Sequence, residues 1–142
     1  MKIEFIAQNL DDLAKISCEI IKILGGPRVV CLVGEMGAGK TTLVKELIRN
    51  LGSEELGSSP TFALINNYES LDQGSIYHMD LYRLNNLEEA FDIGIEDIIY
   101  NKNWCFIEWS EKIKNLLPDN YATIEITVND TQFRHIVLSQ SI

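Results

Sequence analysis

The chain has 142 residues, 46% of them hydrophobic, and carries a formal net charge of −9 with an isoelectric point near 4.6. This length and apolar content predict a single compact domain over residues 1–142. The acidic balance argues against a surface that holds a nucleic-acid backbone alone, because neutralising phosphates takes clustered Lys and Arg. Any contact with RNA would therefore need a partner.

The cysteines and the apolar runs indicate the compartment. Cys18, Cys31 and Cys105 lie inside apolar segments, in odd number and without C-x-x-C spacing. This pattern predicts buried reduced thiols of a cytosolic protein rather than disulfides or metal ligands. The first residues hold no long apolar core, and no apolar run approaches the ~18 residues of a membrane span. We expect a soluble, cytoplasmic protein with no membrane partner.

The N-terminal segment predicts a strand followed by a helix. Residues 2–7 alternate in polarity, and Asn9 is suited to cap the helix that begins after it. Gly25-Gly26-Pro27 then ends the helix. We expect this helix to pack on the core, with its start placed to border a bound nucleotide.

Residues 29–51 have the pattern of a phosphate-binding P-loop. A β-branched run at 29–33 suits a buried parallel strand, and the next eight residues, 34–41, spell G-x-x-x-x-G-K-T. Apolar residues then recur at helical spacing until Gly52. The alternative is an ordinary glycine turn between a strand and a helix, but the motif and both flanks agree on a P-loop.

Each fixed position of that motif has a task when a nucleoside triphosphate binds. Gly34 and Gly39 allow backbone conformations that a Cβ would obstruct, so that successive N–H groups surround the β-phosphate. The helix that follows directs its first N–H groups at the same anion. Lys40 adds a positive charge near the β- and γ-phosphates, and the Thr41 hydroxyl is a ligand for Mg²⁺.

A second segment with a possible role in nucleotide binding runs from Ser58 to Glu69. Pro60 restrains the chain just before Thr61, which places a hydroxyl where the γ-phosphate sensor of a nucleotide switch would lie. A strand is predicted over residues 62–69. The alternative is a plain strand start with Thr61 exposed.

Residues 76–84 begin as a strand and end in polar groups. Alternation places His78 and Asp80 on one face. Asp80 is suited to bind a magnesium-linked water or to accept a proton from an attacking one, and Arg83 to pair with a carboxylate or stabilise phosphate charge. The alternative is a solvated face with an Asp–Arg surface pair, and an isolated histidine such as His78 favours a structural role.

Residues 87–100 predict two short helices interrupted at Gly94. Their acids form one acidic surface, which is either a solvated face or a docking site for a basic partner. These acids are Glu88, Glu89, Asp92, Glu96 and Asp97.

Residues 104–108 predict a buried strand that ends in a carboxylate. Such a strand is the second signature of P-loop proteins, because its terminal acid reaches Mg²⁺ at the carboxyl edge of the sheet. Glu108 is therefore the predicted metal carboxylate; alternatively it starts the helix predicted at 110–116. Trp109 packs either on a ligand or in the core. Residues 122–128 and 133–138 predict a terminal antiparallel hairpin, with its turn at 129–130.

These motifs together resemble one family. The segments GEMGAGKTTLVKELIRNLG, SPTF before a strand, HMDLYRL, and IEWSEK before LP have the order and spacing of the TsaE (YjeE) family of tRNA threonylcarbamoyladenosine biosynthesis ATPases. The resemblance implies an α/β P-loop NTPase fold, with a compact mixed β-sheet flanked by helices and a C-terminal antiparallel hairpin.

The resemblance also implies a function. Proteins like this one support the addition of a threonylcarbamoyl group to adenosine 37 of tRNAs that read codons starting with A. The transfer belongs to the partner proteins TsaD and TsaB, and tRNA is contacted only indirectly. ATP binding and slow, Mg²⁺-dependent hydrolysis by the TsaE protein reset that complex between turnovers.

Family roles carry over where the motifs match. Lys40, Thr61, Asp80 and Glu108 would serve catalysis, and Thr41 with Glu108 would hold Mg²⁺. An adenine pocket is expected near Asn9 or Leu10 and Arg134. The residues expected to bind ATP are Gly37, Ala38, Gly39, Lys40, Thr41, Thr42, Trp109 and Arg134.

Two other classes use the same P-loop. A small-molecule kinase needs a lid with several phosphate-facing arginines, and the segment after Tyr82 offers only Arg83 before Arg134. A non-catalytic, nucleotide-dependent adaptor is harder to exclude, because sequence shows binding groups better than rates. With no evident arginine finger besides Arg83, we expect slow hydrolysis by the isolated protein.

Overall fold

The computed structural model describes residues 1–35, 37–53, 64–129 and 132–140. Thr61, with the rest of the SPTF motif, lies outside the described residues, so its predicted role as a switch hydroxyl stays a prediction. The predicted turn residue Asp130 also lies outside them.

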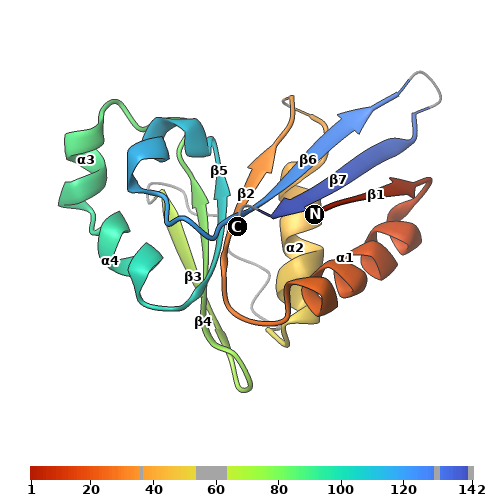
Figure 1. The fold of residues 1–142 in the computed structure, drawn as a ribbon, viewed down its shortest axis with the longest axis horizontal. Helices are drawn as coiled ribbons and strands as arrows, with labels where there is room; N and C mark the ends of the chain where they lie inside the picture. The colour runs from red at the N-terminus through yellow and green to blue at the C-terminus, as the bar shows by residue number, and fades with distance from the viewer. Residues whose placement is uncertain (36, 54–63, 130–131, 141–142) are drawn as a thin grey trace.

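The described residues form seven strands, four α-helices and one 3₁₀ helix (Figure 1). The strands are β1 Lys2–Ala7, β2 Val29–Val33, β3 Ile65–Ser70, β4 Gly74–Asp80, β5 Trp104–Glu108, β6 Ala122–Val128 and β7 Arg134–Gln140. The helices are α1 Leu10–Leu24, α2 Lys40–Asn50, α3 Leu87–Asp92, α4 Ile95–Tyr100 and the 3₁₀ helix η1 Ser110–Leu116.

The strands form one mixed sheet in the order β1-β7-β6-β2-β5-β4-β3. The four strands β6, β2, β5 and β4 run parallel, whereas β1, β7 and β3 join the sheet antiparallel. The predicted mixed sheet and the C-terminal hairpin β6–β7 are confirmed. The strand that leads into the P-loop, β2, lies between β5 and β6 and is therefore held from both sides.

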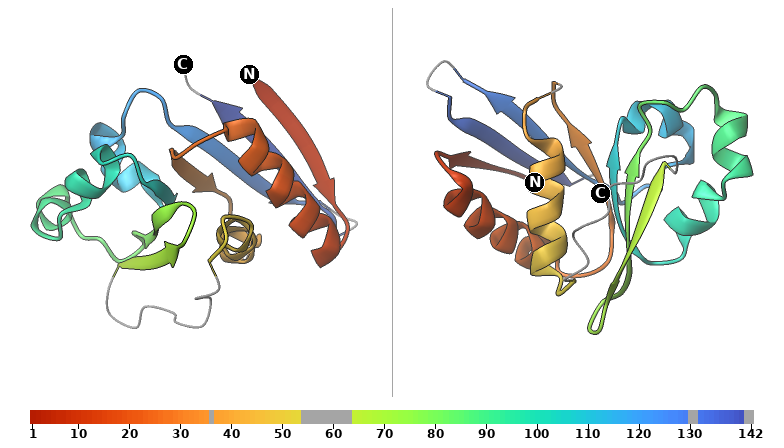
Figure 2. Two further views of the ribbon diagram at one scale, coloured as in Figure 1. Left: turned by 90° about the horizontal axis from the view of Figure 1, so that it is seen from below. Right: turned by 180° about the vertical axis from the view of Figure 1, so that it is seen from behind.

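Helices cover both faces of the sheet (Figure 2). α1 and α2 lie on one face, and α3, α4 and η1 lie on the other. Alternate side chains of β2 enter different cores: Val30 and Leu32 pack with the first pair of helices, and Cys31 packs with the second group. Burial on both faces explains why the β2 and β5 segments are continuous apolar runs.

The ends of α1 follow the predicted caps. The Asn9 Oδ1 atom accepts a hydrogen bond of 2.8 Å from the Asp12 N–H, and Gly25 ends the helix with φ 77°. Gly94, with φ 79°, likewise separates α3 from α4, which confirms the predicted interruption. Of the five acids on this pair of helices, Glu89 is half-buried and accepts a hydrogen bond from the Asn85 N–H; the other four are exposed.

The helix predicted at 110–116 is confirmed, as a 3₁₀ helix with a non-helical Ile113 at φ −124°. One prediction of detail was wrong: Cys18 is half-buried, although Cys31 and Cys105 are buried and all three are free thiols. Burial raises the pKa of Cys31 to about 11 and that of Cys105 to about 12, so both thiols stay protonated at neutral pH. Among the described residues, no helix has the length and apolar character to cross a membrane.

Candidate nucleotide-binding site

The parallel strands β2, β5 and β4 end at one edge of the sheet, and the P-loop leaves β2 there (Figure 1). Gly37 and Gly39 have φ of 86° and 103°, which favour glycine. Gly34 is needed for a different reason, because a Cβ there would lie 2.7 Å from the carbonyl oxygen of Ile126 in β6. The loop is thus pressed against the neighbouring strand.

The start of α2 suits an anion. Its N-cap is Gly39, which has no side chain to accept from the first-turn N–H groups, and no acid lies in the first turn. Those N–H groups and the positive end of the helix dipole therefore face the loop. Thr41 and Thr42 are exposed at this end of the helix. The predicted phosphate-binding residues of the loop and the helix start are together.

Lys40 is buried, and its Nζ lies 4.7 Å from the ring centroid of Trp109. This is a cation–π contact. Trp109 has a left-handed backbone conformation with φ 62°, and its ring packs on Tyr82 with centroids 5.0 Å apart. Trp109 is half-buried beside the P-loop lysine.

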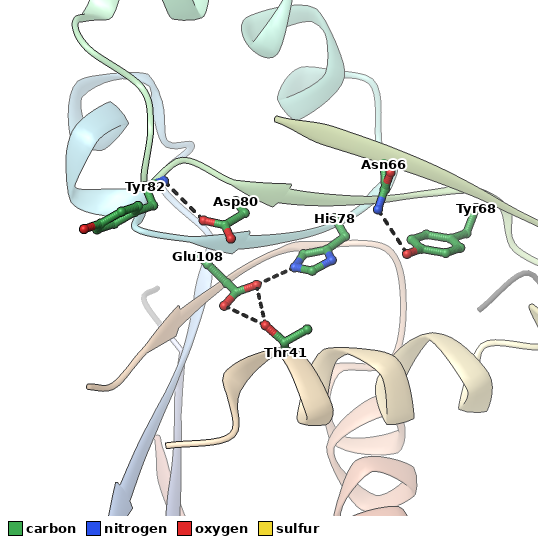
Figure 3. A network of polar contacts seen from close by, with 7 residues as sticks. All are labelled: Thr41, Asn66, Tyr68, His78, Asp80, Tyr82 and Glu108. Atoms are coloured by element: carbon green, nitrogen blue, oxygen red, sulfur yellow. Dashed lines mark hydrogen bonds and ion pairs between the residues drawn. The ribbon is translucent and has the colours of Figure 1, made fainter. Parts of the chain in front are cut away.

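Glu108, at the end of β5, is 3% exposed and points toward the start of α2 (Figure 3). The Thr41 Oγ1 atom lies 3.3 Å from both carboxylate oxygens of Glu108. The His78 Nε2 atom lies 2.6 Å from Oε2. Glu108 belongs to the strand and contacts α2, so the alternative that it merely starts the next helix is wrong.

Asp80 lies at the same edge but in a different environment. It is the register partner of Glu108 across the parallel β4–β5 pair, yet it is exposed, and its Oδ1 accepts a 3.2 Å hydrogen bond from the Tyr82 N–H (Figure 3). Arg83 is also exposed, and within the described parts of the chain no ion pair joins it to Asp80. The Asp–Arg surface pair of the alternative interpretation is therefore not formed between these two described residues.

A groove of about 740 Å³ extends from the P-loop along β6. Its lining residues are Val33, Gly34, Glu35, Gly37, Ala38, Glu125, Ile126, Thr127 and Val128. Arg134 is beside the P-loop, where its Nε donates a 3.0 Å hydrogen bond to the Ala38 carbonyl oxygen. The Asn9 side chain caps α1 instead of lining this groove, and Leu10 is exposed.

The contact between His78 and Glu108 was not predictable from the sequence pattern. Alternation placed His78 on the face of Asp80, but the pairing of β4 with β5 brings its ring to the Glu108 carboxylate. Within the part of the chain that the structure describes, no group of three or more His, Cys, Asp or Glu side chains is arranged to hold a metal ion.

Comparisons with known proteins identify the family of this chain. The model of the family described as threonylcarbamoyl adenosine biosynthesis protein TsaE matches residues 7–136. The chain belongs to the TsaE family.

Its relatives include proteins named tRNA threonylcarbamoyladenosine biosynthesis protein TsaE. That of Treponema pallidum is 38% identical over 87% of this chain and 90% of its own length. That of Aquifex aeolicus is 40% identical over 78% of this chain and 79% of its own. The crystal structure of Bacillus subtilis YdiB, 25% identical, superposes with a TM-score of 0.76 over 100% of this chain and 86% of YdiB. The α/β P-loop NTPase fold is confirmed.

Proposed function

We propose that this TsaE-family protein is an ATPase that supports formation of threonylcarbamoyladenosine at position 37 of tRNAs reading A-starting codons. It would bind ATP with Mg²⁺, hydrolyse it slowly, and thereby reset the transferase complex of TsaD and TsaB. The names of its relatives support the pathway. The observation that carries the ATPase proposal is the buried Glu108 carboxylate facing Thr41 at the end of the P-loop.

The side chains at this edge fit Mg²⁺ with a nucleotide. Mg²⁺ prefers hard oxygen ligands and takes only one or two from the protein, with phosphates and waters completing its shell. Thr41 Oγ1 and the Glu108 carboxylate are such oxygens and lie 3.3 Å apart. When bound, Mg²⁺ would neutralise charge on the phosphates during transfer.

The chain's own residues would then act as follows. The N–H groups of the loop and of the first turn of α2 bind the β-phosphate, and Lys40 leaves the Trp109 ring to pair with the β- and γ-phosphates. Asp80, exposed next to Glu108 in register, accepts the proton of the attacking water. Thr61 would sense the γ-phosphate. Residues 1–142 would act as one domain in the cytoplasm, where tRNA is modified.

The groove along β6, about 740 Å³ in volume, has room for the nucleoside, and it begins at the P-loop residues Gly34, Glu35, Gly37 and Ala38. Arg134 would support this region by holding the Ala38 carbonyl. Because Arg134 and Lys112 both donate to backbone carbonyls, neither is arranged as part of a kinase-type phosphate lid.

ATP hydrolysis by the purified protein, alone and with the TsaD and TsaB proteins of the same organism, tests the proposal. We expect slow activity that changes in the complex and disappears in Lys40→Ala. Lys45→Ala is the matched control, because Lys45 is exposed on the same helix. Unchanged activity without any complex would contradict the partner-gated function.

A reconstituted tRNA reaction separates a cycling ATPase from an adaptor. Asp80→Asn should retain ATP binding but stop threonylcarbamoyladenosine formation after about one turnover of the complex, if hydrolysis resets it. Mass spectrometry of the modified nucleoside measures this. Multiple turnovers by Asp80→Asn would favour the adaptor, and transfer of phosphate to a small acceptor would favour the kinase.

A further inference from the structure

His78 is the side chain at the candidate site to which the motifs assigned no chemistry. It lies on β4, its ring points at the Glu108 carboxylate, and both side chains are nearly buried, at 10% and 4% exposed (Figure 3). An ionised carboxylate only accepts hydrogen bonds, so the ring nitrogen at 2.6 Å is the donor. A short bond to a carboxylate in a buried place is a strong one.

The two partners of Glu108 differ in what they fix. Thr41 Oγ1 lies 3.3 Å from each oxygen, so its contact is long and does not distinguish one oxygen from the other. The His78 bond is short and goes to Oε2 alone. It therefore sets the rotation of the carboxylate and leaves Oε1 with only the long contact to Thr41 at the start of α2.

The two partners also differ in how they are supported. His78 and Glu108 stand on adjacent parallel strands in a fixed register, in which His78 pairs with Phe106 and Asp80 with Glu108. Thr41 stands on α2, directly after the loop that would receive the phosphates. The contact between His78 and Glu108 thus lies within the sheet, whereas the Thr41 contact depends on the position of the start of α2.

We propose that His78 is a positioning residue, which holds the Glu108 carboxylate in the orientation that receives Mg²⁺ beside Thr41. The inference rests on the proposed binding of ATP and Mg²⁺ at this site. His78 acts through Glu108 and touches neither the nucleotide nor the metal. Partners that orient a metal-binding carboxylate typically contribute 10–100-fold to metal affinity.

The test is calorimetric titration with a non-hydrolysable ATP analogue, once with Mg²⁺ and once with EDTA. His78→Phe keeps a ring but removes the donor, and His78→Gln restores a donor at a similar reach. We expect His78→Phe to bind the analogue in EDTA with the wild-type affinity. The factor by which Mg²⁺ raises that affinity should be about tenfold smaller than in the wild type. His78→Gln should recover most of that gain.

His135→Phe is the matched control, because His135 contacts a carboxylate too, Glu4, on the exposed outer strands. It should leave both affinities unchanged. If His78→Phe does not fold, as judged by circular dichroism, His78→Asn makes the same comparison, since its amide is too short to reach Oε2.

Three results would overturn the inference, and they differ from one another. A full Mg²⁺ gain in His78→Phe would show that His78 does not position Glu108. Equal losses with Mg²⁺ and with EDTA would indicate a purely structural role. A wild-type protein that binds the analogue without any gain from Mg²⁺ would instead contradict the metal part of the proposed function, on which the inference depends.

Discussion

At the scale of single residues, the contact between Lys40 and Trp109 links the P-loop to an aromatic pair. The ammonium lies over the indole ring at 4.7 Å, and the ring in turn packs on Tyr82. Phosphates at the P-loop would compete with the Trp109 ring for the Lys40 ammonium. An ion pair with phosphate is stronger than a cation–π contact at a partly solvent-exposed site. The tryptophan would then lose its cation.

We therefore predict that ATP binding changes the fluorescence of Trp109. The measurement uses a Trp104→Phe background, since the chain has two tryptophans. Lys40→Met in that background keeps the aliphatic stem but removes the charge. This variant should show no fluorescence change, even at ATP concentrations that saturate its binding site. The same response in Lys40→Met would show that the ring senses the nucleotide without the lysine.

Gly34 carries a second prediction at this scale. A Cβ at this position would meet the Ile126 carbonyl oxygen at 2.7 Å, and a backbone atom of a central strand cannot move aside cheaply. Gly34→Ala should lower the free energy of unfolding by about 1–3 kcal/mol and weaken ATP binding, because the loop must shift. Denaturant unfolding and ATP titration measure the two effects.

Gly26→Ala is the control for that substitution. Gly26 has no heavy atom within 4 Å of an added Cβ and needs no positive φ. Its free energy of unfolding should stay within about 0.5 kcal/mol of the wild type. If Gly34→Ala were equally neutral, the close approach between the P-loop and β6 would not be a feature of the protein in solution.

At the scale of elements, the helices, strands and turns that continuous segments encode were predictable, but the pairing of strands across the sheet was not. The unit of β2, P-loop and α2 is encoded in one continuous stretch, and so is the interruption at Gly94. The ring of His78 reaches Glu108 only because β4 lies beside β5, and that neighbourhood is a long-range property of the sheet. The role of Thr61 stays a prediction, since it lies outside the described residues.

The sequence predicted a helix at η1 but not its type. Its buried residues, Ser110, Ile113 and Leu116, recur every third position, which matches the three residues per turn of a 3₁₀ helix. Over seven residues this spacing differs little from an amphipathic α-helix. The entry from Trp109 at positive φ, without a capping side chain, also leaves the α form without its usual start.

η1 also anchors the connection between β4 and α3. Lys112 donates from its Nζ to the carbonyl oxygens of Tyr82 and Leu84, so one ammonium satisfies two groups of that loop. Lys112→Met should lower the free energy of unfolding by about 1–3 kcal/mol and speed amide exchange around Tyr82. Hydrogen-exchange mass spectrometry checks this.

Lys114→Met is the control, because Lys114 is exposed on the same segment. It should leave exchange in the loop unchanged. Equal protection of the loop in both variants would indicate that packing, rather than the Lys112 hydrogen bonds, holds the segment after β4.

At the scale of the whole molecule, the fold supports a nucleotide site, whereas the net charge disfavours direct contact with RNA. The sheet places β5 and β6, from the C-terminal part of the chain, beside β2, so the P-loop is supported by residues far from it in sequence. The terminal hairpin was predicted from alternation, and the mixed sheet from the resemblance to the TsaE family. The pairing of β1 with β7 was not predicted, because an edge partner leaves little local signal. The net charge of −9 is the sum over the whole chain.

That charge gives the last prediction: the isolated protein should not bind tRNA at physiological salt, with or without ATP. Binding to phosphates is driven by the release of counterions as Lys and Arg neutralise them, and this chain has 12 such residues against 21 acids. Filter binding with labelled tRNA, in a salt series, measures it. Retention of tRNA only when TsaD and TsaB are added would agree with indirect contact. A salt-dependent complex with the protein alone would instead mean that a local basic surface outweighs the net charge, and the proposal that partners hold the RNA would be wrong.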